Sequence, residues 1–279
     1  MQDLLFSRVA SGPVPDGPTD PQPGRRYRLL AANVQNPGAE RAQRLVAALA
    51  DEAFDVVVLS ELQAKLACQS LLSELRALGY QTTELPDDGG RAYHTAIASR
   101  LRFDELPVAT PSLAGRVRVA RFRAGPAKLY LVGVYGVTYN SRNAEQRQRY
   151  KADFERQILG RLAGVPAGVL IAGDLNILEP RFHDHLPEQV ADDREHYHGF
   201  RTQGFVDLLR AAYPDTAEYT WYSPRSFEGQ RLDHVFAGET ARPWIHELAM
   251  RHDLRRDKLS DHTAIAIALS FPQAGDAPA

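Results

Sequence analysis

The sequence contains little cysteine, little net charge and no long hydrophobic run. Cys68 is the single cysteine among 279 residues, so no intramolecular disulfide can form, and a disulfide-rich secreted scaffold is excluded. No apolar run approaches the roughly 20 residues that a transmembrane helix needs. The first ten residues lack a long apolar core and include Asp3, which argues against an export signal. We therefore expect a soluble, cytoplasmic protein that does not bind membranes.

The chain also has no large excess of positive or negative charge. The 33 Lys and Arg residues nearly balance the 35 Asp and Glu residues, for a net charge of −2. This balance excludes a polycation that grips nucleic acid along its whole length, but it allows a basic face opposite an acidic one. Hydrophobic residues make up 44% of the chain and charged residues 24%, as in globular proteins.

Proline-rich composition is confined to the beginning of the chain. The first 25 residues contain five prolines interleaved with glycine and aspartate. Such a segment buries too little apolar surface to offset its ordering entropy, so we expect residues 1–25 to form a flexible arm. Residues 272–279 are expected to form a similar tail. No Pro- or Gly-rich linker divides the residues between them, and 26–271 are predicted to form one domain.

Short apolar runs alternate with amphipathic stretches across this domain. Runs of about four to eight β-branched or apolar residues predict strands. They lie at residues 27–31, 56–59, 95–99, 117–122, 129–135, 169–172, 232–236 and 264–269. Apolar residues spaced four apart predict helices at 42–51, 66–78 and 144–162. Consecutive strands with no intervening helix over residues 95–135 favour an α/β protein with mixed sheets.

Polar side chains follow or begin several predicted strands, where ligands bind in layered α/β folds. They are Asn33, Glu61, Asp174, Asn176, Asp233 and the run Ser260-Asp261-His262. Each could separately be a turn or capping residue. Glu61 is harder to explain in this way, because a carboxylate directly after buried residues is costly unless it is paired or ligated. Together these groups are the ones that metal-assisted phosphodiester cleavage needs.

The same residues occur in the order and approximate spacing of the endonuclease/exonuclease/phosphatase superfamily. The motifs are Asn33, Ser60-Glu61, Gly173-Asp174-Leu175-Asn176, Arg231-Leu232-Asp233 and Ser260-Asp261-His262. Further segments resemble exonuclease III and related AP endonucleases: Gly204-Phe205-Val206-Asp207, Tyr213-Pro214 and Thr220-Trp221-Tyr222. The resemblance covers about residues 27–270. It implies a four-layer α/β sandwich of two packed mixed β-sheets with outer helices.

The resemblance also implies a divalent-metal-dependent nuclease that hydrolyses DNA phosphodiester bonds with Mg²⁺ or Mn²⁺ as cofactor. Glu61 would bind the metal as a hard oxygen ligand, and Asn33 would contribute its amide oxygen. Asp261 would be a second or a water-mediated ligand. Gln35 stands where the superfamily usually has Asp or Asn.

Five residues would carry the chemistry. Asp174 would orient or deprotonate the attacking water, and Asn176 would donate a hydrogen bond to a phosphate oxygen. His262 would stabilise the phosphate, with Asp233 holding its ring and favouring the imidazolium. Tyr135 resembles the superfamily's phosphate-facing tyrosine.

The residues expected to contact the substrate match the AP endonuclease pattern only in part. Trp221 and Leu232 match two apolar positions of the sugar pocket of AP endonucleases, whereas Gln230 stands at a third. Gln230 and the near-neutral charge motivate an alternative substrate, namely RNA, a nucleotide or another phosphoester. A non-catalytic binding module on the same fold is a third hypothesis. Arg116 and Arg118 begin a basic strand, which either contacts phosphates or forms a solvated face.

The expected partner is nucleic acid, with DNA as substrate and DNA repair as the process. We expect a monomer with no obligate protein partner. The His-rich stretch 181–198 could chelate a transition metal, but no cysteine or strict helical spacing supports a zinc site. It is interpreted as a polar, mobile loop.

Overall fold

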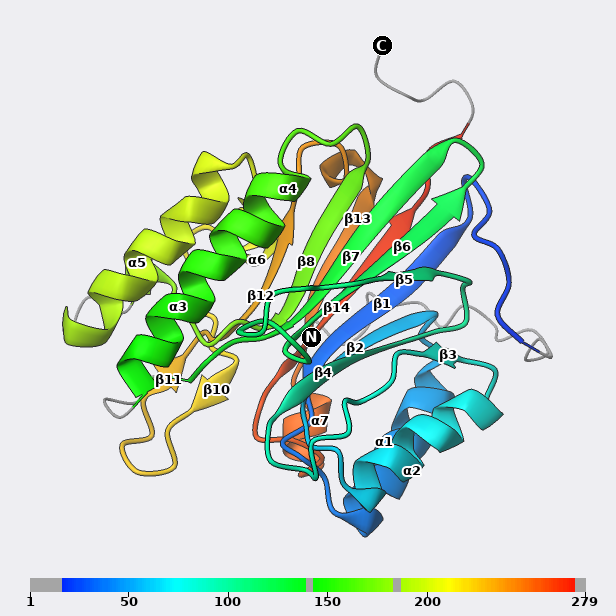
Figure 1. The fold of residues 1–279 in the computed structure, drawn as a ribbon, viewed down its shortest axis with the longest axis horizontal. Helices are drawn as coiled ribbons and strands as arrows, with labels where there is room; N and C mark the ends of the chain where they lie inside the picture. The colour runs from blue at the N-terminus through cyan, green and yellow to red at the C-terminus, as the bar shows by residue number, and fades with distance from the viewer. Residues whose placement is uncertain (1–16, 139–142, 183–186, 274–279) are drawn as a thin grey trace.

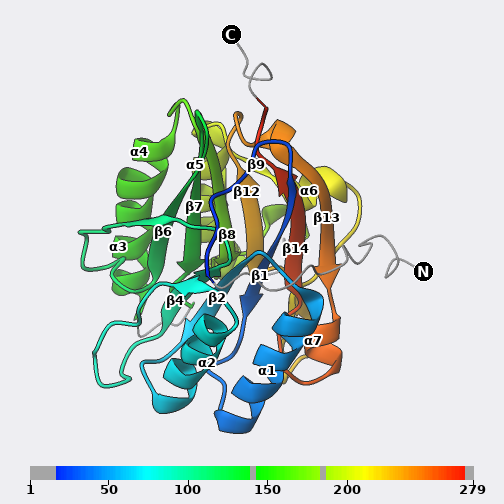
Figure 2. The same ribbon diagram turned by 90° about the vertical axis from the view of Figure 1, so that its right-hand side faces the viewer.

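The computed structural model describes residues 17–138, 143–182 and 187–273, without the side chains of residues 182–192. Two six-stranded mixed sheets pack face to face, and helices cover both outer faces (Figures 1 and 2). This arrangement confirms the predicted four-layer sandwich. Within the described residues, every helix is too short or too polar to cross a membrane.

The first sheet has the strand order β13-β14-β1-β2-β4-β3. Its strands are β1 (Arg26–Asn33), β2 (Val56–Leu62), β3 (Gln81–Thr82), β4 (His94–Ser99), β13 (Ile245–Arg251) and β14 (Ala264–Ser270). Only β1 and β2 pair in parallel, with Asn33 opposite Ser60, and the other neighbours are antiparallel. The outer face of this sheet is covered by α1 (Ala39–Glu52) and α2 (Leu66–Ala77), as Figure 2 shows.

The second sheet has the order β5-β6-β7-β8-β12-β9. Its strands are β5 (Asp104–Leu106), β6 (Val117–Ala124), β7 (Ala127–Tyr135), β8 (Gly168–Asp174), β9 (Val206–Asp207) and β12 (Asp233–Ala237). Here β7 and β8 form the parallel pair, with Tyr135 opposite Asp174. A continuous helical segment packs on the outer face, composed of α3 (Ala144–Phe154), a π-helical turn (Glu155–Leu159) and α4 (Gly160–Leu162). Beside it lies α5 (Pro187–Thr202) (Figure 1).

The remaining elements are short. They are two 3₁₀ turns (Pro180–Phe182 and Arg242–Trp244), α6 (Leu208–Ala212), α7 (Asp253–Arg256) and the hairpin strands β10 (Trp221–Tyr222) and β11 (Gly229–Gln230). The hairpin pairs Trp221 with Gln230 outside the two main sheets.

The central strands are buried on both faces, which explains why they appear in the sequence as continuous apolar runs. Leu29 and Val58 of the first sheet meet Leu131 and Val235 of the second in the core between the sheets. Neighbouring residues of the same strands face the helices, as Leu30 does toward α1. Each predicted strand and helix is present at its expected position.

Two expectations need correction. Residues 17–25, assigned to the flexible arm, join the domain: Thr19 bridges to Leu101 and Pro23 bridges to Phe271. Residues 1–16 and 274–279 lie outside the described residues. The expected loop over 181–198 is wrong from residue 187 onward, because α5 packs against α3 through Phe200 and Phe154. Its few apolar residues hid this helix.

Candidate active site

Polar side chains from both sheets converge at one edge of the sandwich. The carboxyl ends of the two parallel pairs lie at this edge, together with the amino ends of their antiparallel partners β12 and β14. The side chains are Asn33, Glu61, Tyr135, Asp174, Asn176, Asp233 and His262. Residues far apart in the chain therefore meet, because the parallel pairs of the two sheets end at the same edge.

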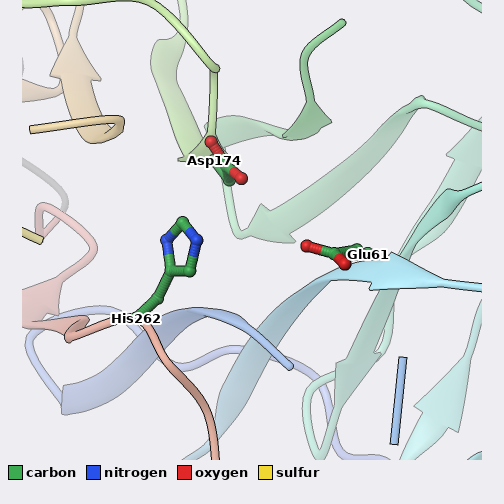
Figure 3. A group of neighbouring side chains, drawn as sticks. All are labelled: Glu61, Asp174 and His262. Carbon is green, nitrogen blue, oxygen red and sulfur yellow. The ribbon is translucent and has the colours of Figure 1, made fainter. Parts of the chain in front are cut away.

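Glu61, Asp174 and His262 form the centre of this cluster. One potential ligand atom from each lies within 4.8 Å of the others, and Figure 3 shows the three side chains around a common space. Asn33 joins the two carboxylates, because its Nδ2 donates to Glu61 Oε2 at 2.9 Å and to Asp174 Oδ2 at 2.8 Å. The same Nδ2 lies 3.5 Å from His262 Nε2.

A β-bulge directs Glu61 into the site. Between Leu59 and Leu62, β2 contains one more residue than its partner β4, whose paired residues are Ala96 and His94. Glu61 adopts a left-handed conformation, with φ of 62°. Bulges of this kind re-aim a side chain, and a non-glycine residue at positive φ persists only where its surroundings enforce it.

The turn after β8 is fixed in a similar way. Asp174 Oδ1 accepts a hydrogen bond from the Asn176 N–H at 2.9 Å, and Asn176 has φ of 51°. Gly136, after β7, packs directly on this turn, since a Cβ there would lie 1.9 Å from the Leu175 carbonyl oxygen. The turn thus requires glycine at position 136. It also brings the Asn176 Nδ2 to 3.4 Å from the Gly136 oxygen.

His262 is oriented by Asp233, with Nδ1 lying 2.7 Å from the Asp233 Oδ2. Ser260 Oγ accepts from the His262 backbone N–H at 3.0 Å and donates to the Asn33 carbonyl at 2.6 Å. The imidazole is 5% exposed. Its Nε2 is consequently left to face the two carboxylates, which is the orientation that a phosphate-contacting donor needs.

The electrostatics of the cluster are strongly negative. Burial raises the pKa of Asp174 to about 7, and the neighbouring Asp233 adds to the rise. Burial also raises the pKa of Glu61. Burial by itself would lower the pKa of His262, but the Asp233 and Asp174 carboxylates outweigh it and raise the value to about 10. A divalent cation would relieve the repulsion between the two acids.

The oxygen ligands suit a hard cation such as Mg²⁺ or Mn²⁺. Besides Glu61 and Asp174, the site contains Asp261, whose Oδ2 accepts from Trp221 Nε1 at 3.0 Å. The other oxygen of Asp261, Oδ1, is buried and has no hydrogen-bond partner among the described residues. Asn33 differs from the expected oxygen ligand. Its Oδ1 accepts from the Gln35 N–H at 2.8 Å, so it presents N–H to the carboxylates.

A cleft with a volume of about 610 Å³ opens over the cluster. Tyr135, Trp221 and Leu232 all line it, as expected from the sequence. Its remaining lining includes Thr138, Asn176, Ser223, Arg225, Ser226, Gln230 and Asp261. Burial raises the pKa of Tyr135, so its hydroxyl stays neutral and can donate a hydrogen bond.

The two arginines predicted to bind substrate have different surroundings. Arg116 lies beside the cleft, where its Nη1 donates to the Gly136 oxygen at 3.1 Å and its guanidinium lies 5.2 Å from the centre of the Tyr135 ring. Arg118 does not line the cleft and instead pairs with Glu105 at 3.0 Å. Neither arginine lines the cleft itself, and of the two it is Arg116 that contacts Tyr135, a residue of the cleft wall.

Two supporting groups were not expected from the sequence. The hydroxyl of Thr220 accepts from the backbone N–H groups of Leu232 and Asp233 at 3.0 and 3.1 Å, which fixes the start of β12. Arg147, 2% exposed, donates to the Asn176 carbonyl at 2.9 Å and pairs with the buried Asp193. A run of exposed-type residues such as 144–153 gives no sign that one arginine is buried.

The His-rich stretch gives no metal centre within the part of the chain that the structure describes. There, Glu61, Asp174 and His262 are the only cluster suited to a metal ion. His196 is buried and lies 3.3 Å from Glu155 Oε1. His183 and His185 lie outside the described residues.

Solved structures share the fold of this chain. An AP endonuclease from Archaeoglobus fulgidus superposes with a TM-score of 0.72 and 18% identity, covering 87% of this chain and 99% of that one. A 3′-5′ exonuclease from Neisseria meningitidis superposes with a TM-score of 0.74 and 20% identity, covering 88% and 100%. A 3′ phosphatase from Neisseria bound to a product DNA hairpin superposes with a TM-score of 0.72 and 20% identity, covering 88% of this chain and 100% of that one.

Sequence comparisons agree. An exodeoxyribonuclease from Bacillus subtilis (strain 168) is 26% identical over an alignment of 172 positions that covers 56% of this chain. The match spans 65% of the length of that relative. The sequence profile of the Endonuclease/Exonuclease/phosphatase family matches residues 30–262, a range that contains all the central site residues. The chain therefore belongs to the Endonuclease/Exonuclease/phosphatase family.

Proposed function

We propose that this protein is a divalent-metal-dependent phosphodiesterase that hydrolyses DNA. The observation that carries the proposal is the convergence of Glu61, Asp174 and His262 within 4.8 Å at the base of a cleft. The exodeoxyribonuclease relative and the DNA-bound structural neighbour support DNA as the substrate class.

Mg²⁺ or Mn²⁺ is the cofactor that the donor set fits, with Glu61 and Asp261 as protein ligands and the Asn33 amide beside them. When bound, this cation neutralises negative charge on the phosphate. Asn33 holds the Asp174 carboxylate through the 2.8 Å hydrogen bond from its Nδ2. Asp174 thereby becomes the base that orients and deprotonates the attacking water, a contribution of about 10²–10⁴-fold in rate.

The other side chains bind the phosphate. His262, kept protonated by Asp233, donates from Nε2 to a non-bridging oxygen. Asn176 and Tyr135 line the same cleft and supply neutral donors. Arg116 helps to position Tyr135 through the contact of its guanidinium with the Tyr135 ring.

The hairpin of β10 and β11 supports a macromolecular substrate. Phe227 between these strands is 80% exposed, and Arg225 beside it lines the cleft. An exposed aromatic ring and a cation next to a cleft suit contact with bases and phosphates. Trp221 and Leu232 add apolar side chains to the lining of the same cleft.

The test is hydrolysis of labelled duplexes, one intact and one with a single abasic analogue, with Mg²⁺, with Mn²⁺ and with chelator. Single-stranded RNA and a small phosphodiester serve as alternative substrates. We expect metal-dependent cleavage of DNA that Asp174→Asn abolishes without unfolding the protein. Asp51→Asn is the matched control, because Asp51 is exposed on α1. Absence of turnover on DNA under every condition overturns the proposal.

The protein is further proposed to act as a monomer in the cytoplasm, without an obligate protein partner, in DNA repair. The single cysteine is in keeping with a reducing compartment. Measurement of the molar mass in solution, with and without duplex DNA, tests the monomer.

A further inference from the structure

One wall of the cleft contains a polar side chain that the hydrolytic chemistry does not use. Gln230 on β11 lies opposite Trp221 on β10, and its backbone oxygen accepts from the Thr220 N–H at 3.0 Å. Its side chain is half-buried and lines the cleft. Within the described ranges the Gln230 amide forms no hydrogen bond to protein. The backbone is therefore fixed while the amide remains available to a ligand.

Trp221 is fixed by a different contact. Its Nε1 is already bound to Asp261 Oδ2 at 3.0 Å, so the indole plane is held close to His262, with 6.4 Å between the two ring centres. Leu232 lines the cleft beside it. The cleft therefore offers an aromatic ring held by a hydrogen bond, an apolar side chain and an amide without a protein partner among the described residues.

This combination matches the chemistry of a nucleobase. Bases stack on aromatic side chains, and each base carries donors and acceptors at its edge. A glutamine amide offers both two N–H donors and an oxygen acceptor, so it can pair with such an edge. A sugar without a base would offer no hydrogen-bond partner to the Gln230 amide and no ring to stack on Trp221.

We propose that Trp221, Gln230 and Leu232 form a base-binding subsite, with Gln230 as the specificity-determining residue. The inference rests on the proposed phosphodiesterase function. The subsite receives the base of the nucleotide adjacent to the scissile phosphate, since Trp221 contacts Asp261 and lies beside His262 of the reactive centre. The protein accordingly prefers an intact nucleotide over a baseless sugar at this position.

Two duplexes that differ only in the 3′-terminal residue test this preference. One ends in a normal nucleotide and the other in a tetrahydrofuran abasic analogue, and kcat/KM is measured for release of that residue. We expect the wild-type protein to favour the normal nucleotide. Gln230→Leu, which keeps the size and removes the hydrogen bonds, should reduce the preference about 3- to 10-fold by slowing the normal substrate. Gln69→Leu, an equivalent change on the exposed face of α2, should leave the ratio unchanged.

An equal loss on both duplexes in Gln230→Leu, or a wild-type preference for the abasic end, overturns the subsite. Equilibrium binding of the same duplexes to Asp174→Asn separates this result from failure of the proposed hydrolysis. If the wild-type protein cleaves neither duplex, a binding preference for the base that disappears on adding Gln230→Leu still supports the subsite. Equal binding of both duplexes refutes it. Thermal unfolding of each variant confirms that it is folded.

Discussion

The two sheets of this protein carry the same pairing pattern but stabilise their functional ends differently. Each has one parallel pair, β1/β2 or β7/β8, with antiparallel neighbours on both sides. Each places a carboxylate at the end of the second strand of that pair, Glu61 in the first sheet and Asp174 in the second. The site lies where these ends meet.

Neutral amides hold the turn at the end of the first sheet. Asn36 donates from Nδ2 to Gln63 Oε1 at 2.7 Å, and its backbone N–H donates to the Glu61 carbonyl at 2.8 Å. These contacts are between uncharged groups, and Asn36 is half-exposed. Loss of one such hydrogen bond costs only about 0.5–1.5 kcal/mol.

Buried charges hold the turn at the end of the second sheet. Asp193, 2% exposed, pairs with Arg147 and lies 2.7 Å from Lys151 Nζ, while its other oxygen accepts from the Leu178 N–H at 2.9 Å. Arg147 in turn holds Asn176. A buried charge network is costly to break, because each remaining charge lacks a partner. The turn after Asp174, the proposed general base, is therefore supported by buried charges, whereas the turn after Glu61, the proposed metal ligand, is supported by neutral amides.

The largest expected effect separates the two carboxylates by their roles. Asp174→Asn removes the proposed base, so we expect kcat to fall by about 10²–10⁴-fold at every metal concentration. Glu61→Gln removes a charged metal ligand, so we expect the Mg²⁺ concentration for half-maximal rate to rise about tenfold or more. Steady-state rates across a Mg²⁺ titration distinguish the two. Recovery of Asp174→Asn at high Mg²⁺ would show that both residues serve only as ligands.

The next effect compares the supports behind each carboxylate. Asp193→Asn removes the buried carboxylate that pairs with both Arg147 and Lys151, and we expect the free energy of unfolding to fall by about 3–5 kcal/mol. Asn36→Ala should lower it by only about 1 kcal/mol. Urea denaturation measures both. Equal losses in the two variants would mean that the supports do not differ as their burial indicates.

The sequence alone revealed the strands of both sheets and the polar residues at their ends, because both appear as continuous patterns along the chain. The central strands are buried on both faces, so they stand out as apolar runs, and the polar residues at their ends mark the site. The β-bulge at Glu61 left no such mark, because a positive φ at a glutamate depends on tertiary surroundings. The ion pair between Arg147 and Asp193 joins residues 46 apart, and no local periodicity connects them.

The sequence also did not reveal how each side chain is oriented in the site. Asn33 was expected to present its amide oxygen to the metal, but the Gln35 N–H occupies that oxygen. The helix α5 was missed because its buried residues, such as Tyr197 and Phe200, are few and lie among charged ones. Residue identities therefore predicted which groups meet, whereas packing determined which atoms face one another.

A smaller effect concerns the contact that joins the two sheets. His262 precedes β14 of the first sheet and Asp233 begins β12 of the second. In Asp233→Asn, burial is no longer outweighed by the adjacent carboxylate, so the pKa of His262 should fall from about 10 by about 2 pH units or more. NMR titration of the imidazole in the metal-free protein measures this. An unchanged pKa would assign the stabilisation of the imidazolium to other residues.

The smallest expected effect is a difference in how stability responds to acid between two carboxyl groups, buried Asp207 in the second sheet and half-buried Asp55 beside the first. Burial opposes ionisation of Asp207, but Arg231, paired with it at 2.7 Å, holds its pKa below the usual value. Its contribution to stability is therefore complete above about pH 5 and is lost progressively as the pH falls further. Burial raises the pKa of Asp55, next to β2, despite the hydrogen bond from the Arg28 N–H. Asp55 consequently opposes folding at neutral pH, and this penalty disappears as the pH falls through its folded-state pKa.

Unfolding free energies measured from pH 6 to pH 3 should show these opposite signs. Relative to the wild-type protein, Asp207→Asn should lose less stability over this range, by about 1 kcal/mol, and Asp55→Asn should lose more, also by about 1 kcal/mol. The Asp207→Asn protein starts from a lower stability at neutral pH because Arg231 stays buried. It is therefore the slope, and not the absolute stability, that compares the sheets. Parallel curves for both variants would mean that neither carboxyl titrates differently in the folded state, and would remove electrostatic asymmetry as a distinction between the two halves.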